Sequence, residues 1–166
     1  MPPSDQISLL RPILFALGTT YCTIIIHGLA LALIIRLVRR DFLLGRAGVA
    51  IWKDVIIVSG ATLLALTAHL VEIALWALLF SEIGEFLNFA AAFYHSAVNY
   101  TTLGYGDVVM SPSWRMLGPL EAADGMLMFG VSTGAIFAVV QRLIQERFTD
   151  SGALKPRKTG PARREK

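Results

Sequence analysis

Three long stretches of apolar residues constrain this chain more than any other feature of its sequence. Residues 12–35 carry no formal charge, and residues 55–80 contain only Glu72. A third stretch, roughly 120–144, has two acidic residues near its start and is otherwise uncharged up to Val140. A transmembrane helix needs about 20 predominantly apolar residues. Each stretch is therefore long enough to cross a membrane.

The composition excludes an ordinary soluble domain. Hydrophobic residues make up 55% of the 166 residues and charged residues 16%, whereas charged residues are about 25% of an average soluble domain. A chain of this length suits one compact unit. Cys22 is the single cysteine, which excludes a disulfide within the chain. We interpret Cys22 as a buried structural thiol.

These stretches predict an all-α membrane protein with three transmembrane helices, at residues 12–38, 55–80 and 120–147. The first stretch could instead belong to a signal peptide, whose apolar region is about 7–15 residues long and precedes a small-residue cleavage site. This stretch is longer and is closed by arginines that begin at Arg36. We therefore expect a retained helix.

A shorter apolar stretch, residues 86–98, cannot span a bilayer. We expect a re-entrant helix at residues 85–99, entered from a polar break in which Ser81 could be the N-cap. This helix leads directly into a loop at residues 101–107. Pro112 and Pro119 mark the remainder of that loop.

Basic residues give the expected orientation. Apart from Arg11 and Arg115, the fifteen Lys and Arg lie around the linker 39–54 or from Arg142 onward. Segments rich in Lys and Arg stay on the cytoplasmic side. We expect a cytoplasmic linker, a basic and disordered cytoplasmic tail at 148–166 and an outside N-terminus at 1–11, in a plasma or inner cell membrane.

The basic clusters have further interpretations. Nucleic-acid binding is not needed to explain them, because topology accounts for both clusters, and contact with anionic lipid would be a secondary effect. Arginines at every third position are typical of a voltage sensor. However, Arg36, Arg39 and Arg40 all lie beyond the apolar stretch, so we reject voltage sensing.

The loop at residues 101–107 carries the most specific motif. It reads Thr-Thr-Leu-Gly-Tyr-Gly-Asp and closely resembles the selectivity filter of the potassium-channel family. The resemblance extends from about residue 86 to residue 142. It implies a homotetramer that conducts K⁺ passively, with no enzymatic activity, no cofactor and no nucleic-acid partner.

The physics of such a filter explains its residue types. K⁺ must exchange its water shell for rings of backbone carbonyls, and aiming successive carbonyls inward needs conformations that glycine tolerates best. The resemblance assigns ion contact to the carbonyls of residues 102–105 and to the Thr102 hydroxyl. Leu103 replaces the family's usual Val or Ile, which leaves its carbonyl unchanged. The filter as a whole comprises Thr102, Leu103, Gly104, Tyr105 and Gly106.

The resemblance also implies supporting residues. Thr101 and Asp107 flank the filter. Tyr94 and His95 occupy positions at which many relatives have two Trp, one of which commonly bonds the acid. We therefore expect Tyr94 or His95 to bond Asp107.

The last predicted span resembles the family's inner helix. Gly130 and Gly134 lie in its middle, where each glycine permits bending and costs about 1 kcal/mol relative to alanine. Either one could be a gating hinge or could allow close helix packing. Three polar or aromatic residues on this helix are expected to face the pore cavity: Ser132, Thr133 and Phe137.

His69 and Glu72 lie on one face of the second predicted span. Ionisable groups inside a membrane are costly and are candidates for a function. The pair could sense protons, or could bind a metal ion with a third ligand such as His27. A structural pair that anchors this span to the short helix or to the first span also explains them, and we favour that interpretation.

Three alternatives to a potassium channel remain at this point. A less selective cation channel or a nonconducting regulatory subunit would use the same scaffold. An intramembrane enzyme is the third, but the chain has no recognisable nucleophile or metal-ligand motif. An enzyme would also leave the Gly-Tyr-Gly sequence unexplained.

Overall fold

The computed structural model describes residues 10–150, which form helices and connecting loops without a strand. The helices are α1 (Leu10–Leu43), α2 (Ile51–Glu82), α3 (Phe89–Tyr100) and α4 (Leu117–Asp150). Three of them, α1, α2 and α4, are long and apolar enough to cross a membrane. The predicted all-α class with three such helices is confirmed. The first residues of the predicted disordered tail, 148–150, are instead the end of α4. The rest of that tail and most of the predicted outside N-terminus lie outside the described residues.

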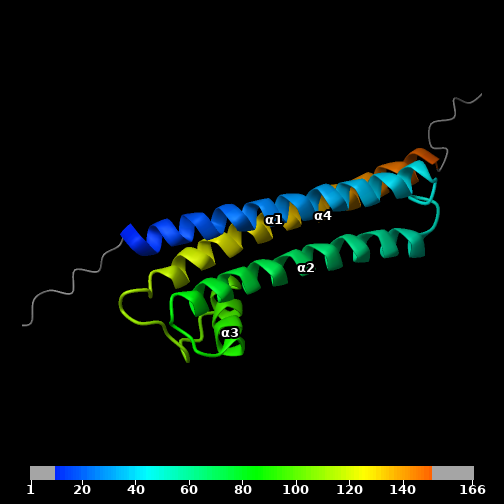
Figure 1. Ribbon diagram of the computed structural model, residues 1–166. Coiled ribbons are helices and arrows are strands. Elements are labelled where there is room, and N and C mark those ends of the chain that lie inside the picture. Colours follow the sequence, from blue (N-terminus) through cyan, green and yellow to red (C-terminus); the bar gives the residue numbers. More distant parts are fainter. Residues whose placement is uncertain (1–9, 151–166) are drawn as a thin grey trace, which may run out of the picture.

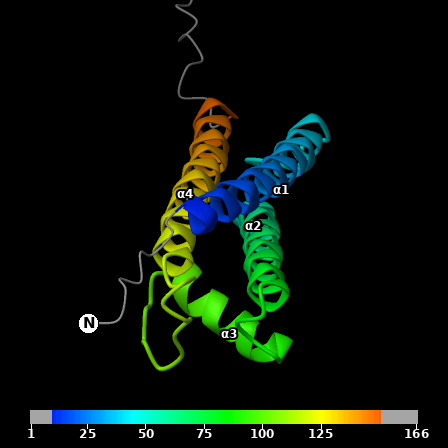
Figure 2. The same cartoon turned by 60° about the vertical axis from the view of Figure 1, so that its left-hand side comes forward.

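The three long helices pack side by side, and α3 lies at one end of them (Figure 1). Every pair of helices is in contact except α1 and α3. Figure 2 shows α1 lying across α2 and α4, and α3 lying between α2 and α4 at the end where these two helices are apart. The short helix and the loops on either side of it therefore stand at one end of the molecule, and the α1–α2 linker stands at the other (Figure 1).

The long helices extend beyond the predicted spans. The first continues to Leu43, because arginine is a good helix former and does not end a helix. The last begins at Leu117 and includes Pro119 in its first turn, where the missing proline N–H has no helical partner to lose. Pro119 therefore belongs to α4 and not to the loop before it.

The short helix begins later than predicted. The N-cap is Asn88, whose side chain accepts a hydrogen bond from the Ala90 N–H at 2.9 Å. The predicted cap at Ser81 is wrong: Ser81 lies in the last turn of α2 and its hydroxyl donates to the Ala77 carbonyl at 3.0 Å. Gly84, with a φ of 80°, supplies the left-handed conformation just beyond the end of α2.

Two apolar clusters hold the helices together. One lies towards α3 and includes Trp76, Phe80, Tyr100 and Leu117, and the other lies towards the linker and includes Ile34, Ile57, Val139 and Leu143. Buried polar residues occupy the stretch between these clusters on all three long helices: Thr23, His27, His69, Glu72 and Ser132. Asp124 is also buried and lies beside them on α4, between Leu117 and Met128 of the first cluster. The polar layer is therefore enclosed by apolar packing on both sides.

Apolar side chains also cover much of the outer surface. Leu29, Leu63 and Leu127 are each more than 60% exposed, as expected for helices that contact lipid or other protein. Cys22 is exposed as well, so the expectation of a buried thiol is wrong. Its neighbour Thr23 takes the position that faces Asp124, which turns Cys22 outward.

The linker between α1 and α2 is fixed to the end of α4. The Gly48 N–H donates to Asp54 Oδ1 at 2.8 Å, and Asp54 Oδ2 pairs with Arg147. The ends of all three long helices that carry the basic clusters therefore meet at one side of the protein (Figure 1).

Candidate functional site

The loop that leaves α3 has a regular alternation of backbone conformation. Thr102, Gly104 and Gly106 have φ values of 60°, 59° and 70°, in the left-handed region that only glycine adopts without strain. Every second residue from 102 to 106 is thus left-handed. The sequence predicted special backbone conformations at the two glycines but not at Thr102, because a residue with a Cβ is rarely left-handed.

Four successive carbonyl groups of the same loop have no hydrogen-bond partner among the described residues. The N–H groups of Leu103 and Gly104 both donate to the Val98 carbonyl, at 2.9 and 3.2 Å. Within residues 10–150, however, the carbonyl oxygens of residues 102–105 accept no hydrogen bond. A row of four unpaired carbonyls on an irregular backbone can contact a cation or water.

Side chains of the loop are exposed in the single chain. Leu103 is 55% exposed and Tyr105 is 66% exposed. The Thr101 hydroxyl instead returns to the helix and donates to the Ala97 carbonyl at 2.7 Å. The loop is therefore anchored on the α3 side, and the side chains of Leu103 and Tyr105 are more than half exposed.

Tyr94 and His95 divide the support of the loop between them. The Tyr94 hydroxyl donates to Asp107 Oδ2 at 2.8 Å, and this bond to the carboxylate raises the pKa of Tyr94. His95 does not reach Asp107; its Nδ1 donates to the Val108 carbonyl at 3.0 Å. Of the two expected partners of Asp107, Tyr94 is the one in contact.

The tautomer of His95 follows from its two neighbours. A carbonyl only accepts, so Nδ1 carries the hydrogen, and Nε2 accepts from the Asn99 side-chain amide at 2.8 Å. Burial lowers the pKa of His95, which keeps the ring neutral. A proton on Nε2 would face the Asn99 N–H and break that contact.

A second anchor holds the segment beyond the loop. Glu85 accepts hydrogen bonds from the Ser111 backbone N–H at 2.7 Å and from the Ser111 hydroxyl at 2.6 Å. Sequence reasoning missed this contact, because nothing in the spacing of the two residues indicates it. The loops before and after α3 are therefore joined to each other.

The glycines of α4 differ in their surroundings. A Cβ on Gly125 would lie 2.1 Å from the Tyr100 carbonyl oxygen, whereas a Cβ on Gly130 or Gly134 meets nothing within 4 Å in this chain. Close approach of α4 to α3 therefore depends on Gly125, which the sequence did not single out. Neither Gly130 nor Gly134 supports close packing within one chain.

The residues expected to face a cavity do not share one environment. Thr133 and Phe137 are exposed. Ser132 is 5% exposed and points to α1 and α2, so its predicted position facing the cavity is wrong. The cause is its hydroxyl, which lies 3.0 Å from a ring nitrogen of both His27 and His69.

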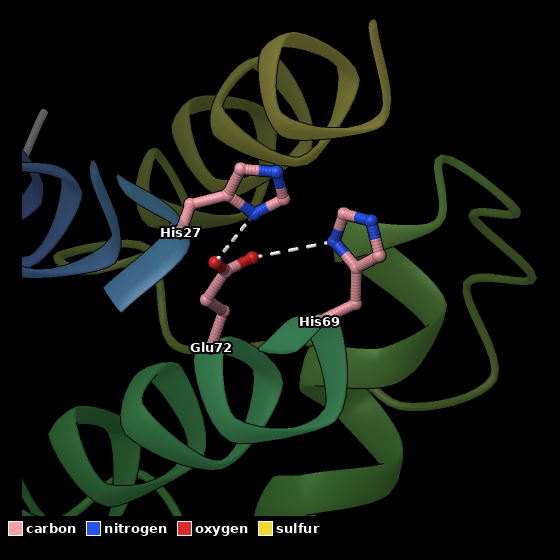
Figure 3. Close-up of side chains that lie close together, drawn as sticks. All are labelled: His27, His69 and Glu72. Atoms are coloured by element: carbon pink, nitrogen blue, oxygen red, sulfur yellow. Dashed lines mark hydrogen bonds and ion pairs between the residues drawn. The ribbon is translucent and has the colours of Figure 1, made fainter. Parts of the chain in front are cut away.

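His69 and Glu72 are part of a larger buried cluster. Glu72 Oε1 lies 2.9 Å from His27 Nδ1, and Glu72 Oε2 lies 3.3 Å from His69 Nδ1 (Figure 3). Tyr100 donates its hydroxyl hydrogen to Glu72 as well. The cluster thus joins α2 to α1 through His27 and to α3 through Tyr100. The donor atoms of His27, His69 and Glu72 lie within 4.8 Å of one another, so these three residues could hold a metal ion.

Asp124 forms a second polar group beside this cluster. It accepts from the Trp76 indole N–H at 2.9 Å and from the Thr23 hydroxyl at 2.8 Å. Glu121, one turn earlier on α4, is bonded to the Ser96 hydroxyl. Neither acid was singled out as a site from the sequence, because acids near the end of an apolar stretch are common at membrane surfaces.

Three membrane-capable helices, with a short helix and an irregular loop between the second and third, define a multi-pass membrane protein. A family model described as an ion channel matches residues 55–142, which is more than half of the 166 residues. The chain belongs to this ion-channel family, and the predicted membership of a pore-loop channel family is confirmed. The family consists of transport proteins, so the enzyme alternative is wrong. No curated protein and no solved structure matches the chain.

Proposed function

We propose that this protein is a potassium-selective channel that conducts K⁺ passively through a homotetrameric pore. The observation that carries the proposal is the row of unbonded carbonyls at residues 102–105, on a backbone with left-handed residues at every second position. Four such loops around an axis would offer rings of oxygens that replace the water shell of K⁺. The Thr102 hydroxyl would complete the inner ring.

The surroundings of the loop support an assembly of several copies. Irregular backbone at membrane depth is tolerated only where protein buries it or where it lines a wet cavity. In one chain, Leu103 and Tyr105 remain more than half exposed. Neighbouring copies would cover these side chains and place the carbonyls at the shared axis.

In this proposal α3 is the re-entrant pore helix and α4 lines the inner part of the pore. The C-terminal end of a helix carries about half a negative charge, and α3 ends at Tyr100, directly before the loop. This end would favour a cation below the filter. Thr133 and Phe137, both exposed on α4, would face the cavity, and Gly130 or Gly134 would be the hinge.

The orientation proposed is an outside N-terminus and a cytoplasmic C-terminus, in a plasma or inner cell membrane. It is supported by the basic residues, which gather around the linker and from Arg142 onward. These residues would also contact anionic lipid head groups.

Recording from the purified full-length protein in liposomes tests the proposal. Under opposed K⁺ and Na⁺ gradients, the reversal potential should follow the K⁺ gradient, and Ba²⁺ should block the current. A reversal potential between the two gradients would identify a less selective cation channel. A stable tetramer without current would identify a nonconducting subunit.

A further inference from the structure

Three carboxylates are buried within the long helices: Glu72 on α2, and Glu121 and Asp124 on α4. The ion pairs of Glu72 are formed with His27 and His69, and within residues 10–150 no lysine or arginine pairs with any of the three acids. Charge at membrane depth is costly unless a partner compensates it. A cation held by the two histidines would compensate Glu72, which contacts both rings.

The hydrogens available to the cluster show that two neutral rings cannot satisfy every contact. Both Nδ1 atoms face the Glu72 carboxylate, and both Nε2 atoms lie 3.0 Å from the single hydroxyl of Ser132. If both Nδ1–H groups donate to the carboxylate, each Nε2 needs a hydrogen, and one hydroxyl can give only one. If both Nδ1 atoms bind a cation instead, both Nε2–H groups donate to the two lone pairs of the hydroxyl oxygen. These four contacts are then satisfied, as they would be by one protonated ring, and the metal analysis below separates the two cases.

We propose that His27, His69 and Glu72 bind one divalent transition-metal ion of the zinc type, through the two Nδ1 atoms and the carboxylate. Figure 3 shows the carboxylate between the two rings, with both Nδ1 atoms turned towards it. Neighbouring ligands of a tetrahedral zinc ion lie about 3.3 Å apart when each is about 2.0–2.1 Å from the ion. The separations of 2.9 Å from His27 Nδ1 to Glu72 Oε1 and of 3.3 Å from His69 Nδ1 to Glu72 Oε2 are close to that spacing for a carboxylate that binds through both oxygens.

Further groups around the three ligands suit a metal ion. The Tyr100 hydroxyl lies 3.3 Å from His69 Nδ1 and bonds Glu72, which places a fourth polar group at the site. Histidines that bind metal usually donate their other N–H to an oxygen that orients the ring, and Ser132 supplies that oxygen for both rings.

The site would join parts of the chain that the family match separates. His27 lies on α1, outside the matched residues 55–142, whereas His69 and Glu72 lie within them. Ser132 connects both rings to α4, midway between Gly130 and Gly134. A bound ion would therefore fix α1 against the two long helices of the channel module. This inference does not depend on potassium selectivity.

The test measures bound metal on the purified full-length protein after any affinity tag is removed. The protein is stripped with a chelator, loaded with Zn²⁺ or Co²⁺, and separated from free ion by gel filtration. Elemental analysis should find one ion per chain. The Co²⁺ form should have the intense visible absorption of a tetrahedral ion with nitrogen and oxygen ligands, a measurement that needs no variant.

Variants then locate the ion. His27→Gln and His69→Gln should each abolish stoichiometric binding, and Ser132→Ala should weaken it about 10–100-fold, since it removes only the group that orients the rings. Cys22→Ser, which removes the exposed thiol, and His95→Gln, which removes the histidine outside the cluster, should leave the metal content unchanged. Wild-type protein that retains no metal would overturn the proposal. The same holds if the variant with both His27 and His69 replaced by Gln retains as much metal as wild type.

Discussion

The loop at residues 101–107 and the buried cluster around Glu72 are built in opposite ways. The loop is one continuous stretch of chain, its working groups are backbone carbonyls, and its side chains are largely exposed. The cluster combines side chains from all four helices, and its members are at most 5% exposed. Changes to the loop should therefore act through backbone conformation, and changes to the cluster should act through individual polar atoms.

The largest effect is expected from Gly104→Ala. Gly104 has a φ of 59°, and a residue with a Cβ costs about 1–2 kcal/mol more than glycine in that conformation. In a homotetramer this cost would arise in each of the subunits. We expect loss of potassium selectivity or of current, measured as the K⁺ to Na⁺ reversal potential in liposomes. Leu103→Val is the matched control, because it changes a side chain and keeps the carbonyl, and it should preserve selectivity. If Leu103→Val were as harmful as Gly104→Ala, the contrast between backbone and side chain would be refuted.

The next largest effect is expected in the cluster, from Glu72→Gln. Removing one partner of a buried charged pair typically costs about 3–5 kcal/mol, and Glu72 is bonded to His27, His69 and Tyr100. We expect a clear fall in the unfolding midpoint of the detergent-solubilised protein. Glu82→Gln, at the exposed end of α2, is the matched control and should leave the midpoint nearly unchanged. Equal midpoints for Glu72→Gln and wild type would contradict a structural role of the cluster.

A smaller loss of stability should follow Gly125→Ala. The added methyl group would lie 2.1 Å from the Tyr100 carbonyl oxygen, and overpacking of this kind costs about 1–3 kcal/mol. Gly60→Ala is the control, since a Cβ there meets nothing within 4 Å, and it should be neutral or mildly stabilising. Thermal unfolding of both variants gives the comparison. A midpoint of Gly125→Ala at or above that of Gly60→Ala would show that α3 and α4 can separate without loss.

The smallest effect is a pH dependence that involves His95. Burial lowers the pKa of His95 below the ordinary value of 6.5. The negative charges of Asp107 and Glu85 act in the other direction, but burial has the larger effect. Because the unfolded chain takes up this proton more readily, the contribution of His95 to stability is present above pH 6.5 and is lost as the pH falls towards the lowered pKa. His95→Gln should have a weaker loss of stability between neutral and mildly acidic pH than wild type. His27 and His69 are common to both proteins, so identical profiles would exclude His95 as the source.

Much of the fold was predictable because it depends on local composition. The three apolar stretches predicted the three membrane-capable helices, since length and hydrophobicity alone decide whether a helix can cross a bilayer. The ends of helices were less predictable. Asn88 caps α3 where Ser81 was expected, because several polar residues between two helices can each serve as a cap.

The candidate sites also differ in how far the sequence alone could predict them. The motif at residues 101–107 could be recognised from sequence, and the pair His69 and Glu72 could be recognised as unusual. The sequence also named His27 as one conceivable third ligand. It did not indicate that Ser132 faces both rings and not a cavity, or that Gly125 is the glycine pressed against Tyr100.

The sequence by itself determined that this chain is a membrane protein of an ion-channel family with a glycine-bearing loop, because hydrophobic length and a contiguous motif are local properties. Only the tertiary structure decided which polar groups meet inside it. His27 and Ser132 are separated by more than a hundred residues, and the rotation of each helix decides which of its side chains face inward. That rotation follows from the packing of three helices against one another, a property that no single segment contains.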